Sequence, residues 1–473
     1  MKKQYIITLL ITSLIFTGCS KYLDVAPKSS VAEEQMFASE IGFDQALVGV
    51  YSQLGTQNLY GDRLSLGFVS ALAQNYTQSV STAPYYNTRA LDYNTDEVRN
   101  SLSGIWSSSY NAIAGLNKIL EKAEANRAVL SNDGYNRIKG EALALRAYLH
   151  FDLFRLFGPE YVAGINMKSI PYETKVDAFA NVPLSSKDFC AKVLEDIQES
   201  TALLKDIDPI FNTSTDINTR RIKLNYYGVK GLEARVNMYI GNKVAAAQAA
   251  REVIDSQKFP FVTVSTVNTT AGTKDRLFLN ELVFAVRSRN ILDWTERYFR
   301  FYMNANYGLT RTAANFNTIY ESSTTDIRKL YLFEQDQNVV YPSKFWQTYT
   351  TISGESLTSA RRKDQIVPLI RISEMYYILA ECLDNANEGI IELNKVRTAR
   401  ALVKLPETQT TTDVFLNAEI QKEYHKEFYA EGQYFFYLKR KNIKRLPFLT
   451  VDKPLEIYKL PIPDVELEYN PTY

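Results

Sequence analysis

Apolar residues recur at steps of three and four along much of the chain, a spacing that predicts amphipathic helices. Near the start, Phe43, Leu47 and Val50 share one face, and further along Trp106 and Ile113 share a face of a second helix. The same spacing predicts helices within 137–158, 185–204, 224–256, 368–385, 388–402 and 414–442. The fold is therefore predicted to be mainly α.

Helix-ending residues divide these segments. Gly158 with Pro159 ends one helix, Ser185 is suited to cap the next, and Gly241 with Asn242 breaks 224–256 into two helices. Alanines at 245–247, 249 and 250 would let a partner helix approach closely. This small/large helix–turn–helix pattern resembles tetratricopeptide repeats, which stack in pairs, although no constant period is present.

Two segments, at about 61–100 and 259–365, lack the helical spacing and are rich in polar residues. A loop as long as the first, inside a compact domain, is either functional or disordered. The second contains a strand-like piece at 281–288 and is predicted to form a loop-rich lobe. We therefore expect one body over 33–473, in which helical repeats at about 33–257 and 366–440 carry both insertions. The end of the chain, 459–471, is rich in proline and is predicted to be extended.

The first residues have the pattern of an export signal. Two lysines precede an apolar run at 5–16, which is shorter than the roughly twenty apolar residues that cross a bilayer. Gly18 then precedes Cys19, and a small residue directly before cysteine resembles the lipobox of bacterial lipoproteins. Phe16 stands where leucine is usual in that motif.

This resemblance makes 1–18 a lipoprotein signal peptide and Cys19 the residue that receives diacylglycerol and a further acyl chain such as palmitate. Residues 19–32 would be a lipidated tether. Two or more acyl chains anchor a protein stably, where one is marginal. The alternative is an ordinary signal peptide whose cleavage leaves a chance cysteine.

Composition and charge narrow the classes of function. Lys and Arg number 54 against 53 Asp and Glu, so the chain is near neutral and gives no reason to expect nucleic acid as a partner. Cys190 and Cys382 lie in apolar helical contexts and are interpreted as buried thiols, with a disulfide between them as the alternative. The two histidines, His150 and His425, form no cluster of metal ligands. No phosphate or dinucleotide motif is present, so we expect neither a metal nor another cofactor.

Six short motifs, in order along nearly the whole chain, resemble the SusD/RagB family of nutrient-binding outer-membrane lipoproteins. They are CSKYLDVAPKS at 19–29, GFDQALVGVYSQL at 42–54, EALALRAYLHFDLFRLFG at 141–158, PLIRISEMYYILAECL at 368–383, LNKVRTAR at 393–400 and LPIPDVELEYNP at 460–471. Any one of these motifs is weak alone, but six in order are specific.

The resemblance implies a tetratricopeptide-like helical scaffold with a loop-rich region that carries the ligand site. It implies a lipid-anchored protein of the outer membrane that faces the cell surface and works with a SusC-like TonB-dependent β-barrel transporter. Family ligands are commonly glycans and in some members peptides. The protein would bind and deliver its ligand without catalytic residues of its own.

One helix near the C-terminus departs from the family pattern. Tyr424, Tyr434 and Tyr437 stand where Arg, Arg and Asp are customary, which puts in doubt the family's internal ion-pair network but not its fold. Tyrosine hydroxyls could satisfy some of the same buried groups.

Two sets of carboxylates could suggest acid–base chemistry. Glu423, Glu427 and Glu431 lie four apart, on one face of a helix, whereas a hydrolase places two carboxylates across its substrate. We interpret all three as structural partners of Arg or Lys. Glu374 and Glu381 are interpreted as a buried polar network with Arg371.

The aromatic and amide-rich loop at 75–93 is the best candidate for a ligand site. Rigid rings stack on the CH faces of a sugar, and amide or charged groups bind its hydroxyls. The candidate residues are Tyr76, Tyr85, Tyr86, Asn87, Arg89 and Tyr93. A second candidate is the lobe around Trp294 and Tyr298, with Tyr302 and Tyr307 nearby. Either set could instead contact the barrel or pack in the core, because Tyr and Arg are also enriched in protein interfaces.

Three hypotheses about function follow. The first is a surface lipoprotein that binds an oligosaccharide, or alternatively a peptide, and feeds an outer-membrane transporter. The second is an extracellular hydrolase such as a glycosidase. The third is a repeat scaffold that only assembles partners.

Overall fold

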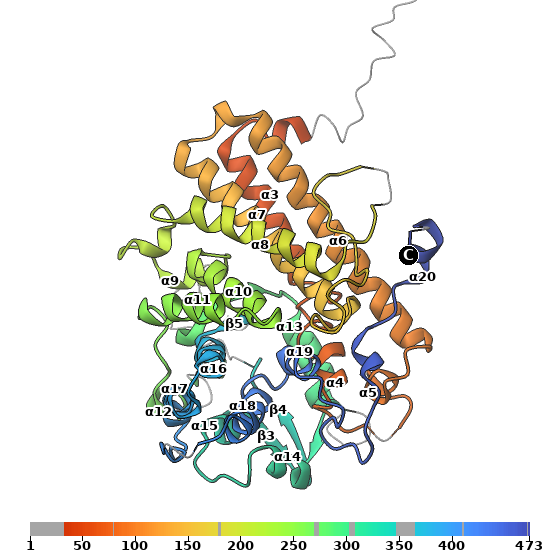
Figure 1. The fold of residues 1–473 in the computed structure, drawn as a ribbon, viewed down its shortest axis with the longest axis vertical. Helices are drawn as coiled ribbons and strands as arrows, with labels where there is room; N and C mark the ends of the chain where they lie inside the picture. The colour runs from red at the N-terminus through yellow and green to blue at the C-terminus, as the bar shows by residue number, and fades with distance from the viewer. Residues whose placement is uncertain are drawn as a thin grey trace, which may run out of the picture.

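The computed structural model describes residues 33–78, 80–177, 181–268, 274–301, 308–346, 365–408, 411–470 and 472–473. The main helices stack side by side from the top of the molecule down to its lower half, where shorter elements and the strands form a lobe beside them (Figure 1). The stacked helices are α3 (Glu40–Leu54), α6 (Asp96–Ala125), α7 (Asn132–Phe157), α8 (Ser186–Leu204), α10 (Tyr226–Tyr239), α11 (Lys243–Asp255), α16 (Ile372–Cys382), α17 (Ala386–Ala399), α18 (Asp413–Glu427) and α19 (Gln433–Arg440).

Shorter elements fill the connections. The helices among them are α4 (Phe68–Leu72), α5 (Tyr86–Ala90), α9 (Ile217–Arg221), α12 (Val264–Val267), α13 (Ile291–Thr295), the π-helix η5 (Glu296–Phe301), α14 (Ala313–Ile319), α15 (Ile327–Tyr331) and α20 (Asp464–Tyr469). The strands are β1 (Leu282–Arg287), β2 (Arg311–Thr312), β3 (Phe333–Asp336), β4 (Val339–Pro342) and β5 (Ile366–Arg371).

Each long helix packs on the next in a continuous series. The series runs α6, α7, α8, α10, α11, α16, α17 and α18. Antiparallel helix pairs that stack in this way are the arrangement of tetratricopeptide repeats. The predicted fold class, a mainly α repeat scaffold with a loop-rich lobe, is therefore confirmed.

The helix boundaries follow the predicted local signals. The Ser185 side chain accepts a hydrogen bond from the Asp188 amide at the start of α8, and Asn242 does the same for α11. Gly241 has a φ of +83°, a left-handed conformation that glycine adopts easily, and it separates α10 from α11. Gly158 follows the last residue of α7, as predicted.

Small side chains let α11 lie close to α16. Ala246, Ala249 and Ala250 are buried on one face of α11, and α16 packs against this helix. These residues have no γ-carbon that could hold the two backbones apart. The burial of these three alanines agrees with the predicted close approach of a partner helix.

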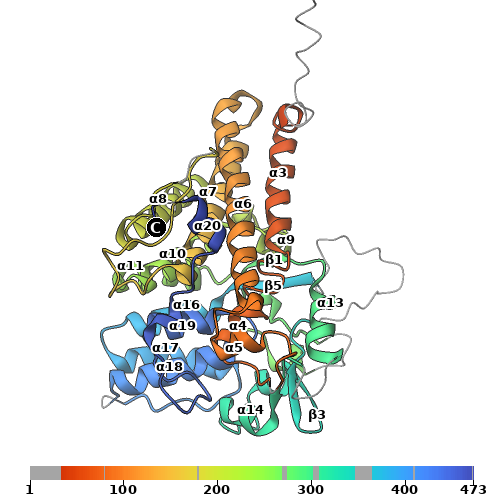
Figure 2. The ribbon, with the colours of Figure 1, turned by 90° about the vertical axis from the view of Figure 1, so that its right-hand side faces the viewer.

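β1 and β5 form a two-stranded antiparallel sheet between the helices and the lobe (Figure 2). β1 pairs with β5, so that Ala285 lies opposite Pro368 and Val286 opposite Val367. The predicted strand at 281–288 is confirmed, but residues 366–371 form a strand where the sequence predicted the start of a helix. All of β5 is buried, and the partner strand lies far away in the sequence. A second small sheet has the order β2–β4–β3.

The C-terminal segment also differs from its prediction. Residues 464–469 form the short helix α20, whereas the sequence predicted an extended segment. Pro463 directly precedes the helix, and Asp464 and Glu466 lie in its first turn, where acidic side chains interact favourably with the helix dipole. Residues 61–100 are not one open loop either, because they include α4, α5 and a series of buried turns.

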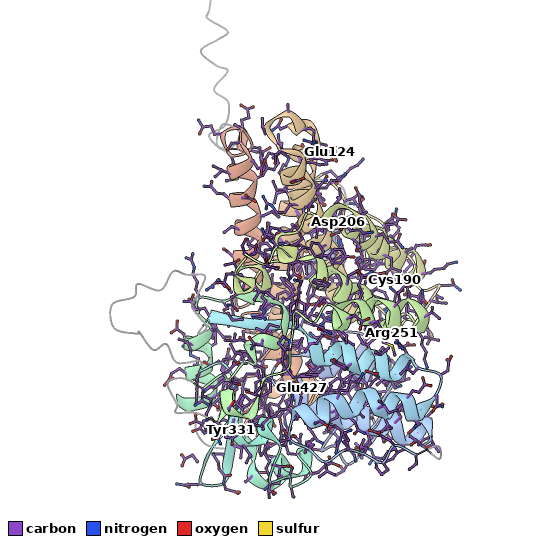
Figure 3. All side chains as sticks on the ribbon, turned by 90° about the vertical axis from the view of Figure 1, so that its left-hand side faces the viewer. Glu124, Cys190, Asp206, Arg251, Tyr331 and Glu427 are labelled. Atoms are coloured by element: carbon purple, nitrogen blue, oxygen red, sulfur yellow. The ribbon has the colours of Figure 1, made fainter. Side chains whose placement is uncertain are left out.

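A buried ion-pair network joins the lobe to the helices. Glu427 of α18 lies deep in the molecule (Figure 3) and accepts hydrogen bonds from Arg328 at 2.8 Å and from Arg371 and Arg400 at 2.6 Å. The three guanidinium groups hold the pKa of Glu427 well below its ordinary value, although burial alone would raise it. Glu423 pairs with Arg328, and Glu431 with Arg371. The structural interpretation of this carboxylate stripe is confirmed.

Buried ion pairs therefore form although tyrosines stand at positions 424, 434 and 437. Tyr424 and Tyr437 stack on each other, with ring centroids 4.4 Å apart. The predicted network of Glu374 and Glu381 with Arg371 is wrong in its partners. Glu374 pairs with Arg235, and Glu381 pairs with Arg440.

Both described cysteines, Cys190 and Cys382, are buried and free, which confirms their interpretation as thiols. In the part of the chain that the structure describes, no helix has the length and apolarity needed to span a bilayer. The predicted signal peptide and Cys19 lie outside the described residues.

Candidate functional site

Asp62 lies where three segments of the chain meet. It follows α3 in a tight turn, in which its backbone oxygen accepts hydrogen bonds from Ser65 and Gly67. Its carboxylate is 0% exposed. Oδ2 accepts a 2.6 Å hydrogen bond from the Tyr85 hydroxyl and a 2.9 Å hydrogen bond from the Tyr298 hydroxyl. Tyr85 directly precedes α5, and Tyr298 lies in η5, so the carboxylate connects the two predicted ligand regions.

Aromatic rings continue from this carboxylate toward the surface. Tyr85 and Tyr298 meet edge to face with centroids 5.9 Å apart. Trp294 stacks on Tyr298 at 5.8 Å with an interplanar angle of 24°. The tyrosines are buried, whereas Trp294 is half-buried and the exposed Arg297 guanidinium lies 5.7 Å from its ring. We call Asp62, Tyr85, Trp294, Arg297 and Tyr298 the aromatic cluster.

The local backbone of η5 suits such a site. The segment Glu296–Phe301 is a π-helix, a rare conformation that often occurs at functional sites. At Tyr85 the backbone is left-handed, with a φ of +58°, which is uncommon for a residue other than glycine. These two unusual conformations lie at the two tyrosines whose hydroxyls meet at Oδ2 of Asp62.

Burial sets the protonation of the Asp62 carboxyl group. Loss of solvation raises its pKa to about 6, although the hydrogen bonds from Tyr85 and Tyr298 act in the opposite direction. Gln57 and Arg63, from its own turn, also favour the charged form. The group therefore titrates near neutral pH.

Arg311 of β2 holds the start of the candidate loop. The guanidinium is 1% exposed and donates hydrogen bonds to the backbone oxygens of Gln74, Asn75 and Tyr76. The Arg311 guanidinium carbon also lies over the Phe448 ring, 3.9 Å from the centroid of that ring. These hydrogen bonds hold the start of the loop that carries Tyr85 against the lobe.

The other predicted residues have different surroundings. Tyr76 is 1% exposed and donates a 2.5 Å hydrogen bond to the Leu66 backbone oxygen, which gives it a packing role in this structure. The Asn87 side chain donates a 2.9 Å hydrogen bond to Glu97. Tyr86 and Arg89 are half-buried on α5. The predicted set is therefore divided, and only Tyr85 of this loop lies in the aromatic cluster.

Tyr93 lies apart from the aromatic cluster. Its hydroxyl donates a 2.6 Å hydrogen bond to the Ile457 backbone oxygen. Its ring lines a groove of about 660 Å³ between the first turns of α6 and the C-terminal segment. Tyr302 and Tyr307 fall outside the described residues.

Sequence reasoning missed Asp62 and Arg311. Neither residue lies in a motif, and the partners of each are distant along the chain. A single carboxylate in a turn gives no signal that two tyrosines will meet it.

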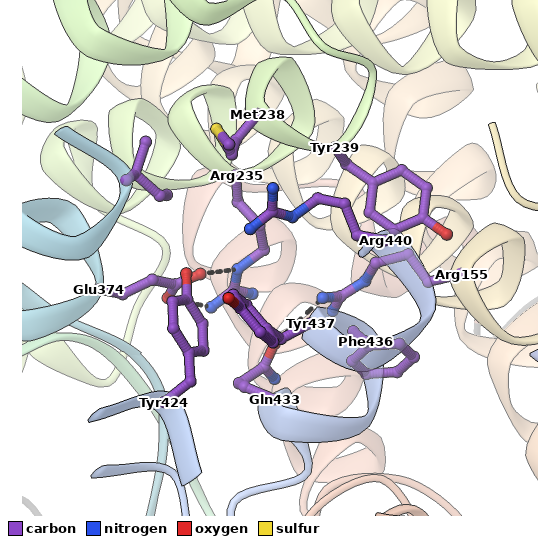
Figure 4. Close-up of a pocket in the computed structure, with 11 residues that line it drawn as sticks. Arg155, Arg235, Met238, Tyr239, Glu374, Tyr424, Gln433, Phe436, Tyr437 and Arg440 are labelled. Carbon is purple, nitrogen blue, oxygen red and sulfur yellow. Dashed lines mark hydrogen bonds and ion pairs between the residues drawn. The ribbon is translucent and has the colours of Figure 1, made fainter. Parts of the chain in front are cut away.

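A second cavity lies inside the helical stack, between α7, α10, α16 and α19 (Figure 4). Arg235 pairs there with Glu374 at 2.7 Å, and Arg155 donates a 3.0 Å hydrogen bond to Gln433. The cavity volume is about 30 Å³, roughly the volume of one water molecule. A sugar or peptide does not fit, so this cavity is not the ligand site.

Metal chemistry has no support in the part of the chain that the structure describes. No three His, Cys, Asp or Glu side chains come together there in a way that could hold a metal ion. The His150 ring accepts a hydrogen bond from the Glu173 amide and stacks on Tyr172, which agrees with its interpretation as a core residue.

Comparisons with known proteins agree with the arrangement of the helices. A family model described as "Starch-binding associating with outer membrane" matches residues 21–215, and the SusD family model matches residues 292–446. SusD-like protein P2 of Formosa agariphila is 22% identical, over 82% of this chain and 79% of its own length.

Solved structures share the fold. A SusD superfamily protein from Bacteroides fragilis matches with a TM-score of 0.71 and 21% identity, over 92% of this chain and 99% of that protein. A SusD-like carbohydrate binding protein from Bacteroides vulgatus matches with a TM-score of 0.71 and 17% identity, over 92% and 97% of the two chains.

Proposed function

Because the chain belongs to the SusD/RagB family, we propose that it is a lipid-anchored protein of the outer membrane that binds an oligosaccharide at the aromatic cluster. It passes the ligand to a SusC-like TonB-dependent transporter and performs no chemistry on it. The observation that carries the ligand proposal is the convergence of Tyr85, Trp294 and Tyr298 from two distant segments on one buried carboxylate.

The cluster has the chemistry that a saccharide requires. The half-buried Trp294 ring offers an apolar face for the CH groups of a pyranose, and the exposed Arg297 guanidinium offers hydrogen-bond donors for its hydroxyls. The Tyr298 ring stacks on the indole ring. A related protein described as a carbohydrate binding protein, from Bacteroides vulgatus, is consistent with this ligand class.

Affinity electrophoresis of the purified mature protein through gels that contain starch, laminarin, xylan or pectin tests the ligand proposal. We expect at least one polysaccharide to retard the protein and Trp294→Ala to weaken its retention by about tenfold, a usual cost of removing a central aromatic contact. Tyr469→Ala is the matched control, because Tyr469 is 72% exposed and lies on α20, outside the cluster.

Three outcomes would contradict the proposal. Equal retention of wild type and Trp294→Ala would place the site elsewhere. Retention of a peptide mixture alone would make the protein a peptide-binding member of the family. Steady release of reducing ends from a retained polysaccharide would make it a hydrolase.

A further inference from the structure

Asp62 is the one described carboxylate that accepts hydrogen bonds from tyrosines of both predicted ligand regions. We propose that Asp62 is a positioning residue, whose charged carboxylate holds Tyr298, and through it Trp294, in the arrangement that binds a saccharide and whose protonation loosens that arrangement. This inference rests on the proposed function and adds a pH dependence to the same site.

The second carboxylate oxygen of Asp62, Oδ1, lies next to Gly67. Oδ1 has no hydrogen-bond partner, and a Cβ atom at position 67 would lie only 1.9 Å from it. A side chain at position 67 would therefore displace the carboxylate or the Tyr85 ring, whose Cε2 atom lies 2.8 Å from the same Cβ position. A buried carboxylate with one unpaired oxygen is costly, and such groups occur where the position of the charge is needed.

Both hydrogen bonds depend on the charge. A hydrogen bond to an ionised oxygen is shorter and roughly twice as strong as one between neutral groups. The titratable and polar groups that interact with the carboxylate are Tyr76, Tyr85, Tyr298, Gln57 and Arg63. Burial raises the pKa of Asp62 to about 6, so the two tyrosines are held strongly above this pH and weakly below it.

Trp294 reports on this coupling without any ligand, because it stacks on Tyr298. We expect the tryptophan fluorescence of the mature protein to titrate between pH 4.5 and 8 with a midpoint near 6. Asp62→Asn should abolish the transition, and Trp294→Phe should remove its signal. A transition that persists unchanged in Asp62→Asn overturns the inference.

Tyr85→Phe gives a second test that keeps the carboxylate. This variant removes one hydrogen bond that favours the charged form, so the midpoint should move to higher pH. Tyr135→Phe is the matched control, since its hydroxyl also donates to a carboxylate, that of Glu124, which lies near the top of the helices (Figure 3). A midpoint that stays fixed or falls in Tyr85→Phe contradicts the inference, whether or not Asp62→Asn folds.

The last measurement uses the polysaccharide that retards the wild type most strongly. Its affinity should fall about threefold to tenfold from pH 7.5 to pH 5, and Asp62→Asn should bind weakly at both values. Asp62→Asn should nevertheless melt no lower than wild type at pH 7.5, because it removes a buried charge. Unchanged affinity in Asp62→Asn overturns the inference. If the fluorescence titrates as expected but no polysaccharide binds, the proposed function fails and the coupling of Asp62 to Trp294 stands.

Discussion

Glu427 illustrates how much a single buried residue can connect. Its carboxylate joins Arg328 of the lobe to Arg371 and Arg400 of the helical body. Burying any of these charges is expensive, and mutual pairing offsets the desolvation cost. Removal of the carboxylate charge would leave three guanidinium groups without their shared partner.

We predict that Glu427→Gln lowers the free energy of unfolding by about 3–5 kcal/mol, the usual result of breaking a buried ion pair from one side. Urea denaturation followed by circular dichroism measures this change. Glu195→Gln is the matched control, because its pair with Lys192 is exposed and should contribute less than about 1 kcal/mol. A loss as small as that of the control would show that the network does not hold the lobe.

Residue roles were predictable where a local pattern encodes them. Three glutamates at steps of four on one face indicate structural partners, and the sequence predicted this for Glu427. The role of Asp62 was not predictable, because it depends on Tyr298, which lies far along the chain. Tyr76 looked like Tyr85 in the sequence, and only the packing separates the buried ring from the one in the aromatic cluster.

At the scale of elements, the lobe holds the candidate loop through one strand. Arg311 of β2 donates to three consecutive backbone oxygens at 74–76, and the Thr77 amide donates to Thr310 at 2.7 Å. The described loop has no helix of its own at this point. The Tyr429 hydroxyl, after α18, also donates to the Asn75 oxygen, so the lobe and the helical body hold the loop together.

We predict that Arg311→Leu speeds amide hydrogen exchange at residues 68–78 while exchange in α7 stays unchanged, because the loop loses its anchor to β2. Exchange followed by mass spectrometry checks this. Arg251→Leu, on the exposed face of α11, is the control and should change neither segment. Global loss of protection in Arg311→Leu would instead give the residue a role in the stability of the entire fold.

Elements with local signals were predicted well. Local sequence was sufficient to predict the helices, because apolar residues recur at helical spacing and Ser185 and Asn242 cap α8 and α11. β5 was missed because a strand needs its partner, and β1 lies in another part of the sequence. α20 was missed because prolines obscured a short helix that begins directly after Pro463.

For the whole molecule, the repeats and the family were predictable from ordered motifs, whereas the meeting of the two ligand regions was not. The motifs describe the scaffold, and the aromatic cluster lies in segments that no motif covers. The place of the protein in the cell follows from the proposed lipid at Cys19 and is separately testable.

We predict that Cys19→Ala moves the protein from the membrane fraction to the soluble fraction of the cell, because the variant cannot receive acyl chains. Fractionation followed by immunoblotting measures the distribution. Cys190→Ala is the control, because this buried thiol is unavailable for modification, and it should stay with the membrane. Membrane association that survives in Cys19→Ala would require another anchor.

The long helix α6 separates the candidate loop from the start of the described chain. In its first turn, Glu97 accepts a hydrogen bond from the Asn87 side chain. Directly after its last residue, the Asn126 side chain donates a hydrogen bond to the Phe37 backbone oxygen, close to where the described chain begins (Figure 2). Thirty helical residues at 1.5 Å each span about 45 Å. Under the proposed lipidation of Cys19, thirteen residues would separate the anchor from Glu33, at the Asn126 end of α6, and the helix would hold the aromatic cluster about 45 Å from that end.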